Sequence, residues 1–81
     1  MKLRIRVFAL AKQLAGSDSV LVSVREPATV RDVRCGLAES CPAIAGLGNQ
    51  MLIAVDSEYA DDSTAVTAKS DVACIPPVSG G

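Results

Sequence analysis

Residues 19–41 read SVLVSVREPATVRDVRCGLAESC, and a change of hydrophobic period within this stretch decides the fold. Its first six residues alternate between polar and apolar, which is the pattern of a β-strand with one buried face. From Val30 onward the apolar residues recur every three or four positions, as on one face of an amphipathic helix. Residues 29–32 fit a capping box at the start of this helix, and Pro42 requires the helix to end near Ser40 or Cys41. The stretch therefore predicts a half-buried strand followed by one main helix.

On the N-terminal side, residues 2–7 alternate strictly, with three basic residues on one face and three apolar residues on the other. This pattern predicts another half-buried strand. Residues 8–15 then change to a helical period, and Gly16 is placed to end a short helix. We expect the two strands to pair antiparallel around this short helical connection.

On the C-terminal side, residues 43–49 are expected to form a loop. Residues 51–55 are all apolar, as in a strand that is covered on both faces. Shorter strands are expected at 59–60, 65–66 and 72–75, separated by polar turns. The order predicts an α+β domain of the β-grasp, or ubiquitin-like, class. Such a domain has a mixed four- to five-stranded sheet with one main helix and a short helix.

Length and composition bound the class of protein. With 81 residues, 49% of them hydrophobic, the chain has material for one small domain, which we expect to span residues 1–75. A net charge of −1 argues against nucleic-acid binding, which needs clustered Lys and Arg. No apolar run approaches the roughly 20 residues of a membrane span, and basic residues interrupt the first apolar stretch where a secretory signal would stand. We therefore expect a soluble cytoplasmic protein that binds neither nucleic acid nor membrane.

Three cysteines are present, Cys35, Cys41 and Cys74, and none of them forms a C-x-x-C motif. Buried or half-buried free thiols in a reducing compartment are favoured over redox or metal-binding roles. The chain has no histidine, which is the usual general base and the commonest zinc ligand. An autonomous hydrolase of the Ser-His or Cys-His kind is therefore excluded. Neither a metal site nor a tightly bound cofactor is expected.

The final stretch, residues 75–81, reads IPPVSGG. Proline lacks a backbone donor, so sheet pairing should end at Pro76. Residues 76–81 are expected to form a flexible tail, stiff at its Pro-Pro base and thin at its Gly-Gly tip. Two residues without Cβ atoms could enter a channel too narrow for other side chains. The stretch is thus typical of a carboxyl terminus presented for chemistry, and the alternative for a Gly-Gly end is an ordinary frayed terminus.

Three stretches then resemble one known family. They are Phe8-Ala9 followed by KQLAG at 12–16, VDSEY at 55–59, and DVACIPPVSGG at 71–81. Together they resemble the small, sulfur-carrier subunit of molybdopterin synthase, of the MoaD/ThiS-type ubiquitin-like family, over essentially the whole chain. Family members often have aromatic pairs where this chain has Val7-Phe8 and Cys74-Ile75, and both replacements remain apolar.

The resemblance implies a carrier whose tail is activated by another protein. An E1-like activating enzyme would adenylate the carboxylate of Gly81 with ATP and Mg²⁺, and sulfur transfer would leave a thiocarboxylate there. The loaded tail would enter a pocket of the large subunit, in a complex of two small and two large subunits, and donate sulfur to cyclic pyranopterin monophosphate. The acid–base side chains are expected on the large subunit. The residues implied to insert together with Gly81 are Gly80, Ser79, Val78, Pro77 and Pro76.

An apolar docking patch is expected around the base of the tail. Its candidates are Phe8, Leu10, Ile53 and Ile75, and the alternative for each is a place in the core. Tyr59 is expected to pack on the sheet rather than to contact a partner.

Three other functions share parts of this pattern. A thiamine-type sulfur carrier has the same fold and a Gly-Gly end but commonly lacks the Pro-Pro-Val-Ser stalk. Ubiquitin, a protein modifier, has basic residues before its diglycine, whereas this tail is uncharged. A pure interaction domain would tolerate residues added after Gly81, which a carrier would not.

Overall fold

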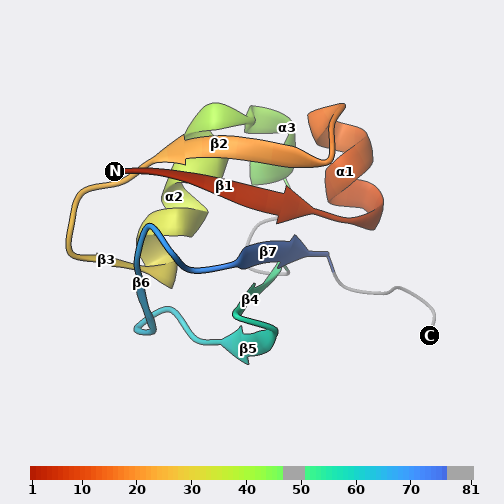
Figure 1. The fold of residues 1–81 in the computed structure, drawn as a ribbon. Coiled ribbons are helices and arrows are strands. Elements are labelled where there is room, and N and C mark those ends of the chain that lie inside the picture. Colours follow the sequence, from red (N-terminus) through yellow and green to blue (C-terminus); the bar gives the residue numbers. More distant parts are fainter. Residues whose placement is uncertain (47–50, 77–81) are drawn as a thin grey trace.

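The computed structural model describes residues 1–46 and 51–76, and Figure 1 shows how they are arranged. The elements follow in the order β1 (Lys2–Val7), α1 (Ala9–Ala15), β2 (Ser19–Ser23), β3 (Ala28–Thr29), α2 (Val30–Ser40), α3 (Pro42–Ala45), β4 (Leu52–Val55), β5 (Glu58–Ala60), β6 (Ala65–Val66) and β7 (Val72–Ile75). Five strands form one sheet in the order β2-β1-β7-β4-β5, and β3 pairs with β6 separately. The central strand β7 runs parallel to β1 and antiparallel to β4. Helix α2 lies across one face of the sheet, and the predicted β-grasp architecture is confirmed.

The connection between the first two strands is also as predicted. β1 and β2 are antiparallel, and α1 lies between them in the chain. Gly16 has a left-handed backbone, with φ of 73°, and its N–H donates to the carbonyl oxygen of Lys12 at 3.0 Å. This is the conformation that favours glycine after the last helical residue.

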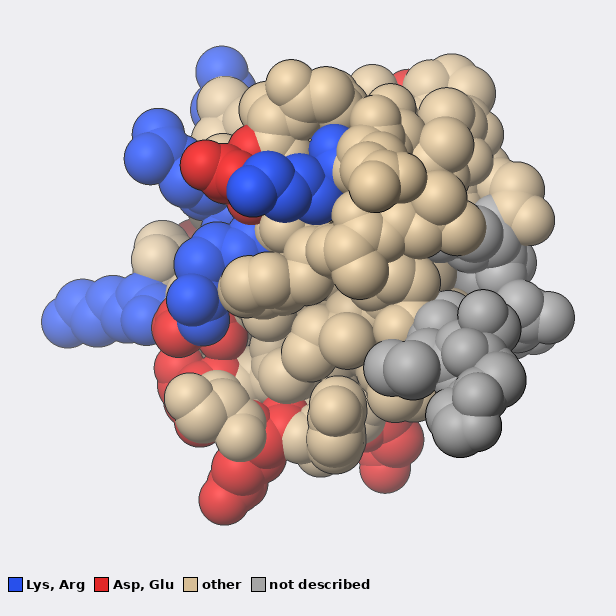
Figure 2. Space-filling model, turned by 90° about the vertical axis from the view of Figure 1, so that its right-hand side faces the viewer, with Lys and Arg blue, Asp and Glu red and all other residues tan. Residues whose placement is uncertain are grey.

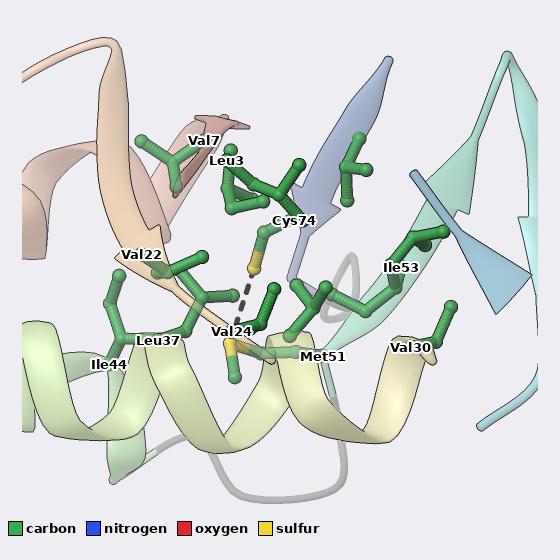
Figure 3. Close-up of a cluster of buried hydrophobic side chains, with 14 of the residues drawn as sticks. Leu3, Val7, Val22, Val24, Val30, Leu37, Ile44, Met51, Ile53 and Cys74 are labelled. Carbon is green, nitrogen blue, oxygen red and sulfur yellow. Dashed lines mark hydrogen bonds between the residues drawn. The ribbon is translucent and has the colours of Figure 1, made fainter. Parts of the chain in front are cut away.

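Helix α2 begins and ends where the sequence predicts. The backbone N–H of Thr29 donates to the Asp32 carboxylate at 2.9 Å, as in a capping box. The helix ends at Ser40, two residues before Pro42. Figure 3 shows the apolar side of α2 turned toward the inward side chains of the sheet.

The core between α2 and the sheet is built from aliphatic side chains, and both aromatic residues lie outside it. Its largest fully buried members are Ile5, Leu37, Ile44, Ile53, Val7, Val22, Val30, Val33, Val72 and Cys74. Full burial of one such aliphatic side chain stabilises the fold by about 1.5–3 kcal/mol. The strict alternation in β1 thus becomes one face in the core and one face that is open.

The three cysteines are free thiols in different environments. Cys74 is buried, and its Sγ lies 3.3 Å from Sδ of Met51 (Figure 3). Burial raises the pKa of the Cys74 thiol to about 11, although the positive charge of Arg34 acts in the opposite direction. Cys74 is therefore a neutral thiol of low reactivity at physiological pH. Cys41 is half-buried, as expected, but the expectation was wrong for Cys35, which is exposed on α2.

The loop expected at residues 43–49 was wrong in part, because α3 occupies its beginning. Pro42 is the first residue of α3, a position where the missing N–H has no intrahelical partner to lose. The same proline thus ends α2 and begins α3, and Ile44 enters the core. Residues 47–49 lie outside the described part of the chain. None of the three helices in the described ranges has the length and apolar character needed to cross a membrane.

Gly36 allows α2 to approach β2 closely. A Cβ atom on Gly36 would lie 3.1 Å from Cβ of Val22, which is tighter than an ordinary van der Waals contact. We expect Gly36→Val to lower the free energy of unfolding by about 1–3 kcal/mol, because the added side chain overpacks this contact. The matched control, Cys35→Val, places the same side chain at the next, exposed position and should change stability by about 0.5 kcal/mol or less. Urea unfolding measures both, and equal losses in the two variants would show that overpacking against Val22 is not the cause.

Candidate functional site

The tail leaves the fold from the central strand of the sheet. β7 pairs with β1 as far as Cys74 and with β4 as far as Ile75. On the β1 side, the N–H of Phe8 also donates to the carbonyl oxygen of Cys74 at 3.3 Å. Pairing ends before Pro76, as predicted. The root of the tail is therefore held on both sides by neighbouring strands.

Pro76 alone among the predicted tail residues lies within the described part of the chain. The sequence places it at the base of a flexible tail, but it is buried and so packs with the domain. The remaining predicted site residues lie outside the described ranges, and their roles stay predictions; they are Pro77, Val78, Ser79, Gly80 and Gly81.

A hollow lies on the open face of the sheet beside the root of the tail. Arg6 is in register with Ala73, and Ala73 is in register with Ala54. Ala54 is in turn in register with Tyr59, so the four residues form one row across four strands. The two central residues carry only a methyl group, and the large side chains at either end stand above them. The resulting depression has a volume of about 270 Å³ and is also lined by Phe8, Ser57, Asp71 and Ile75.

An ion pair closes one side of the hollow. Nε and Nη2 of Arg6 donate to the two carboxylate oxygens of Asp71, at 3.0 and 2.8 Å. The same guanidinium lies 5.6 Å from the centre of the Phe8 ring, within cation–π range. Because both charged side chains are half exposed, the pair contributes little to stability. Its bidentate geometry instead holds the rim of the hollow in one shape.

The turn between β4 and β5 anchors the acidic member of this pair. The N–H of Asp71 donates to the carboxylate of Asp56 at 2.9 Å, and the N–H of Asp56 donates to the carbonyl oxygen of Asp71 at 2.8 Å. Asp56 and Ser57 both have positive φ, 52° and 71°, which is the backbone of the primed two-residue turns that suit hairpin twist. The VDSEY stretch therefore positions the rim as well as joining two strands.

Exposed apolar side chains surround the hollow and continue toward the root of the tail. Phe8 is 41% exposed, Leu52 is 44% exposed and Tyr59 is 71% exposed. Ile75 is half-buried and stands in register with Leu52, so the two share the open face. We call Phe8, Leu52, Tyr59 and Ile75 the open-face patch. A contiguous group of this kind marks an interaction surface, whereas single exposed apolar residues are common.

This patch lacks Leu10 and Ile53 of the predicted one and gains Leu52 and Tyr59, and the differences at Ile53, Leu52 and Tyr59 have a common origin. Ile53 is only 1% exposed and belongs to the core. Leu52 is exposed, although residues 51–55 were expected to be covered on both faces. Tyr59 was expected to pack on the sheet and instead projects from it. One signal in the sequence could have corrected all three: a two-residue turn at 56–57 pairs 54 with 59, which places Tyr59, 54 and 52 on one face.

The other predicted docking residues have the exposure that docking requires. Phe8 and Leu10 are exposed, and Ile75 is half-buried at the root of the tail. Phe8 and Ile75 both line the hollow, whereas Leu10 lies on α1 and does not. Their contact with a partner remains a prediction.

Charge is unevenly distributed over this end of the molecule. In Figure 2, most Lys and Arg side chains gather at the left of the view, acidic side chains lie among them and along the lower edge, and much of the remaining surface is uncharged. Of the residues that line the hollow, only Arg6 and Asp71 carry charge, and they neutralise each other. The described ranges hold no group of three or more His, Cys, Asp or Glu side chains arranged for a metal ion. The arrangement is a largely apolar surface beside Ile75 and Pro76, the last described residues of the chain.

The sequence profile of the ThiS family matches residues 5–81 of the chain. The molybdopterin synthase sulfur carrier subunit of Caenorhabditis elegans is 30% identical over 83 residues, which cover 100% of this chain and 99% of that protein. The protein of the same name from Dictyostelium discoideum is 31% identical over 81 residues, 96% of this chain and 94% of that protein. The crystal structure of SAMP1 from Haloferax volcanii superposes with a TM-score of 0.87 at 29% identity, and all of both chains is covered.

Proposed function

This chain belongs to the ThiS family, and we propose on that basis that it is the sulfur carrier subunit of a molybdopterin synthase. One observation carries the proposal: proteins of that name match the chain from end to end. The family profile also runs through the tail to residue 81. The anchored root of the tail and the open-face patch beside it support the proposal, because a carrier must hold its tail in a defined direction while its body docks.

In the proposed reaction Gly81 is the covalent site. A carboxylate is a poor electrophile, so an E1-like activating enzyme first uses ATP and Mg²⁺ to form an acyl-adenylate and releases pyrophosphate. A persulfide sulfur then attacks the acyl carbon and displaces AMP. A second thiol then attacks the sulfur–sulfur bond, forms a disulfide with the donor sulfur and leaves a thiocarboxylate on Gly81. No cofactor needs to stay bound to the carrier in this scheme.

Delivery takes place in a second complex. The loaded tail enters a pocket of a large subunit, in an assembly of two small and two large subunits, and its sulfur attacks cyclic pyranopterin monophosphate. Six extended residues reach about 20 Å, which allows the reaction to take place well away from the sheet. Gly80 and Gly81 keep the tip narrow, and the large subunit supplies the acids and bases. The proposed compartment is the cytoplasm.

The loading step can be tested by mass spectrometry. We expect the purified chain, incubated with its activating enzyme, ATP and a sulfur donor, to exchange one oxygen for sulfur in the peptide that ends at Gly81. Omitting ATP should prevent the exchange, because the adenylate supplies the leaving group. If the activating enzyme loads another carrier under the same conditions but never loads this one, the proposal is wrong.

A protein modifier is the second candidate function. It is favoured by the full-length structural match to SAMP1, which a second structure from the same organism describes as a small archaeal modifier protein. A modifier would form amide bonds between Gly81 and lysines of other proteins, and these adducts persist on denaturing gels. A thiamine-type carrier would load sulfur but fail to restore molybdopterin synthesis with a large subunit. Denaturing gels and the molybdopterin synthesis assay together distinguish the molybdopterin synthase carrier, the protein modifier and the thiamine-type carrier.

A further inference from the structure

Three basic side chains lie in a line on the open face of β1. Lys2, Arg4 and Arg6 alternate with buried apolar residues, so all three project from the same side of the strand. Residues two apart in a strand are separated by roughly 6.6 Å, which is less than the Debye length of about 8 Å at physiological ionic strength. The three charges therefore repel one another unless a carboxylate is near.

In the described part of the chain only one of the three, Arg6, makes an ion pair. Across the β1–β2 ladder, Lys2 faces Ser23 and Arg4 faces Leu21, neither of which is acidic. Arg6 has its ion pair with Asp71 on the β7 side. Within the ranges 1–46 and 51–76, neither Lys2 nor Arg4 makes an ion pair. The open face of β1 thus carries positive charge that the described part of the chain leaves uncompensated.

This basic stripe is continuous with the open-face patch. Arg4 and Arg6 line a second depression of about 310 Å³ together with Phe8, which belongs to the patch, and with the ion pair of Lys12 and Asp18. Acidic side chains lie farther along the sheet: Asp56, at the β4–β5 turn, is exposed and shares two hydrogen bonds with Asp71, which is paired with Arg6. The basic stripe therefore borders the open-face patch on the β1 side.

We propose that Arg4, with Lys2 beyond it, forms ion pairs with carboxylates of the large subunit when that subunit covers the open-face patch. This inference rests on the proposed function, and it adds the charge of the partner surface that lies over β1. A large subunit with acidic residues over β1 finds opposite charge there. The open-face patch supplies affinity, and the unpaired basic side chains favour a partner that carries carboxylates over β1.

Charge reversal tests the inference directly. We expect Arg4→Glu to weaken binding to the large subunit by roughly tenfold or more at low salt, and the difference from wild type should shrink at high salt. Arg4→Gln should have a smaller effect, because it removes attraction without adding repulsion. The matched control is Arg31→Glu, the same change at an exposed position of α2 on the covered side of the sheet, and its effect should stay within about twofold. Titration calorimetry at both salt concentrations measures all four proteins.

Cross-linking gives a second readout that does not depend on affinity. In the complex of the Arg4→Lys variant, a zero-length carbodiimide reagent should join the new amine to an Asp or Glu of the large subunit. Equal affinities for Arg4→Glu and Arg31→Glu, together with no such cross-link, would overturn the inference while leaving the proposed function intact. The inference is also wrong if Arg4→Glu weakens binding to the activating enzyme alone. Failure of the wild-type chain to bind any large subunit would overturn both.

Discussion

Adding one alanine after Gly81 is expected to abolish sulfur transfer. The extension converts the glycyl carboxylate into a peptide amide, which ATP cannot activate as an acyl-adenylate. It also places a Cβ atom at the tip of a tail whose last two residues have none, so a narrow channel would exclude it. The loss should be complete in two measurements, thiocarboxylate formation with the activating enzyme and molybdopterin formation with the large subunit.

The control for this prediction is an extended protein from which the added residues can be removed, so that Gly81 is again the last residue. An extension that a site-specific protease removes after Gly81 should be inactive before cleavage and fully active after it, because the domain up to Pro76 is unchanged. Binding to the large subunit should survive in the extended protein through the open-face patch, although it will be weaker without the inserted tail. If the extended chain supports molybdopterin synthesis as well as the wild type does, the carrier function is wrong. The remaining function is then that of an interaction domain, which tolerates residues after Gly81.

Replacing Tyr59 by alanine is expected to weaken docking by roughly 10- to 100-fold with little change in stability. Tyrosine is among the residues that most often dominate interface energies, and this one stands at the end of the hollow with 71% of its surface exposed. Because so little of the side chain is buried in the free protein, the free energy of unfolding should change by about 0.5 kcal/mol or less. Titration with the large subunit and urea unfolding measure the two effects separately.

Ile53→Ala is the matched control for Tyr59→Ala, because Ile53 and Tyr59 are close in sequence but lie on different faces of the sheet. The two variants are expected to have opposite effects on binding and stability. Ile53 is 1% exposed, so its truncation leaves a cavity and should cost about 2–5 kcal/mol of stability. Binding by the fraction that remains folded should be nearly unchanged. If Tyr59→Ala binds as tightly as wild type, the open-face patch is not the docking surface.

The features predicted correctly from the sequence depend on neighbouring residues. The capping box at 29–32, the proline that ends α2, and the glycine that ends α1 act within one or two turns of backbone. The alternation in β1 likewise identifies its inward face without reference to any other strand. Such signals can be read from a single sequence because the interactions that produce them span only a few residues.

The errors at the site have a common cause. Residues 51–55 are apolar throughout, and their pattern contains no information on which face a helix covers. That choice depends on β4 lying between β7 and β5, and on α2 crossing only one side of the sheet. Leu52 and Tyr59 were therefore not expected to be exposed on the open face. For Ile53 the core alternative is correct, and Phe8, a candidate for docking or for the core, is exposed.

The sequence by itself determined the fold class, the anchored end of the last strand and the chemical character of the tail, because short-range periodicity, caps and prolines specify them. Only the tertiary structure decided that Arg6, Ala73, Ala54 and Tyr59 stand in one row and enclose a hollow. These residues come from four strands that are far apart in the chain, and the register between strands depends on packing across the whole sheet. Periodicity within one segment specifies a strand, whereas a surface made by several strands exists only after they have paired.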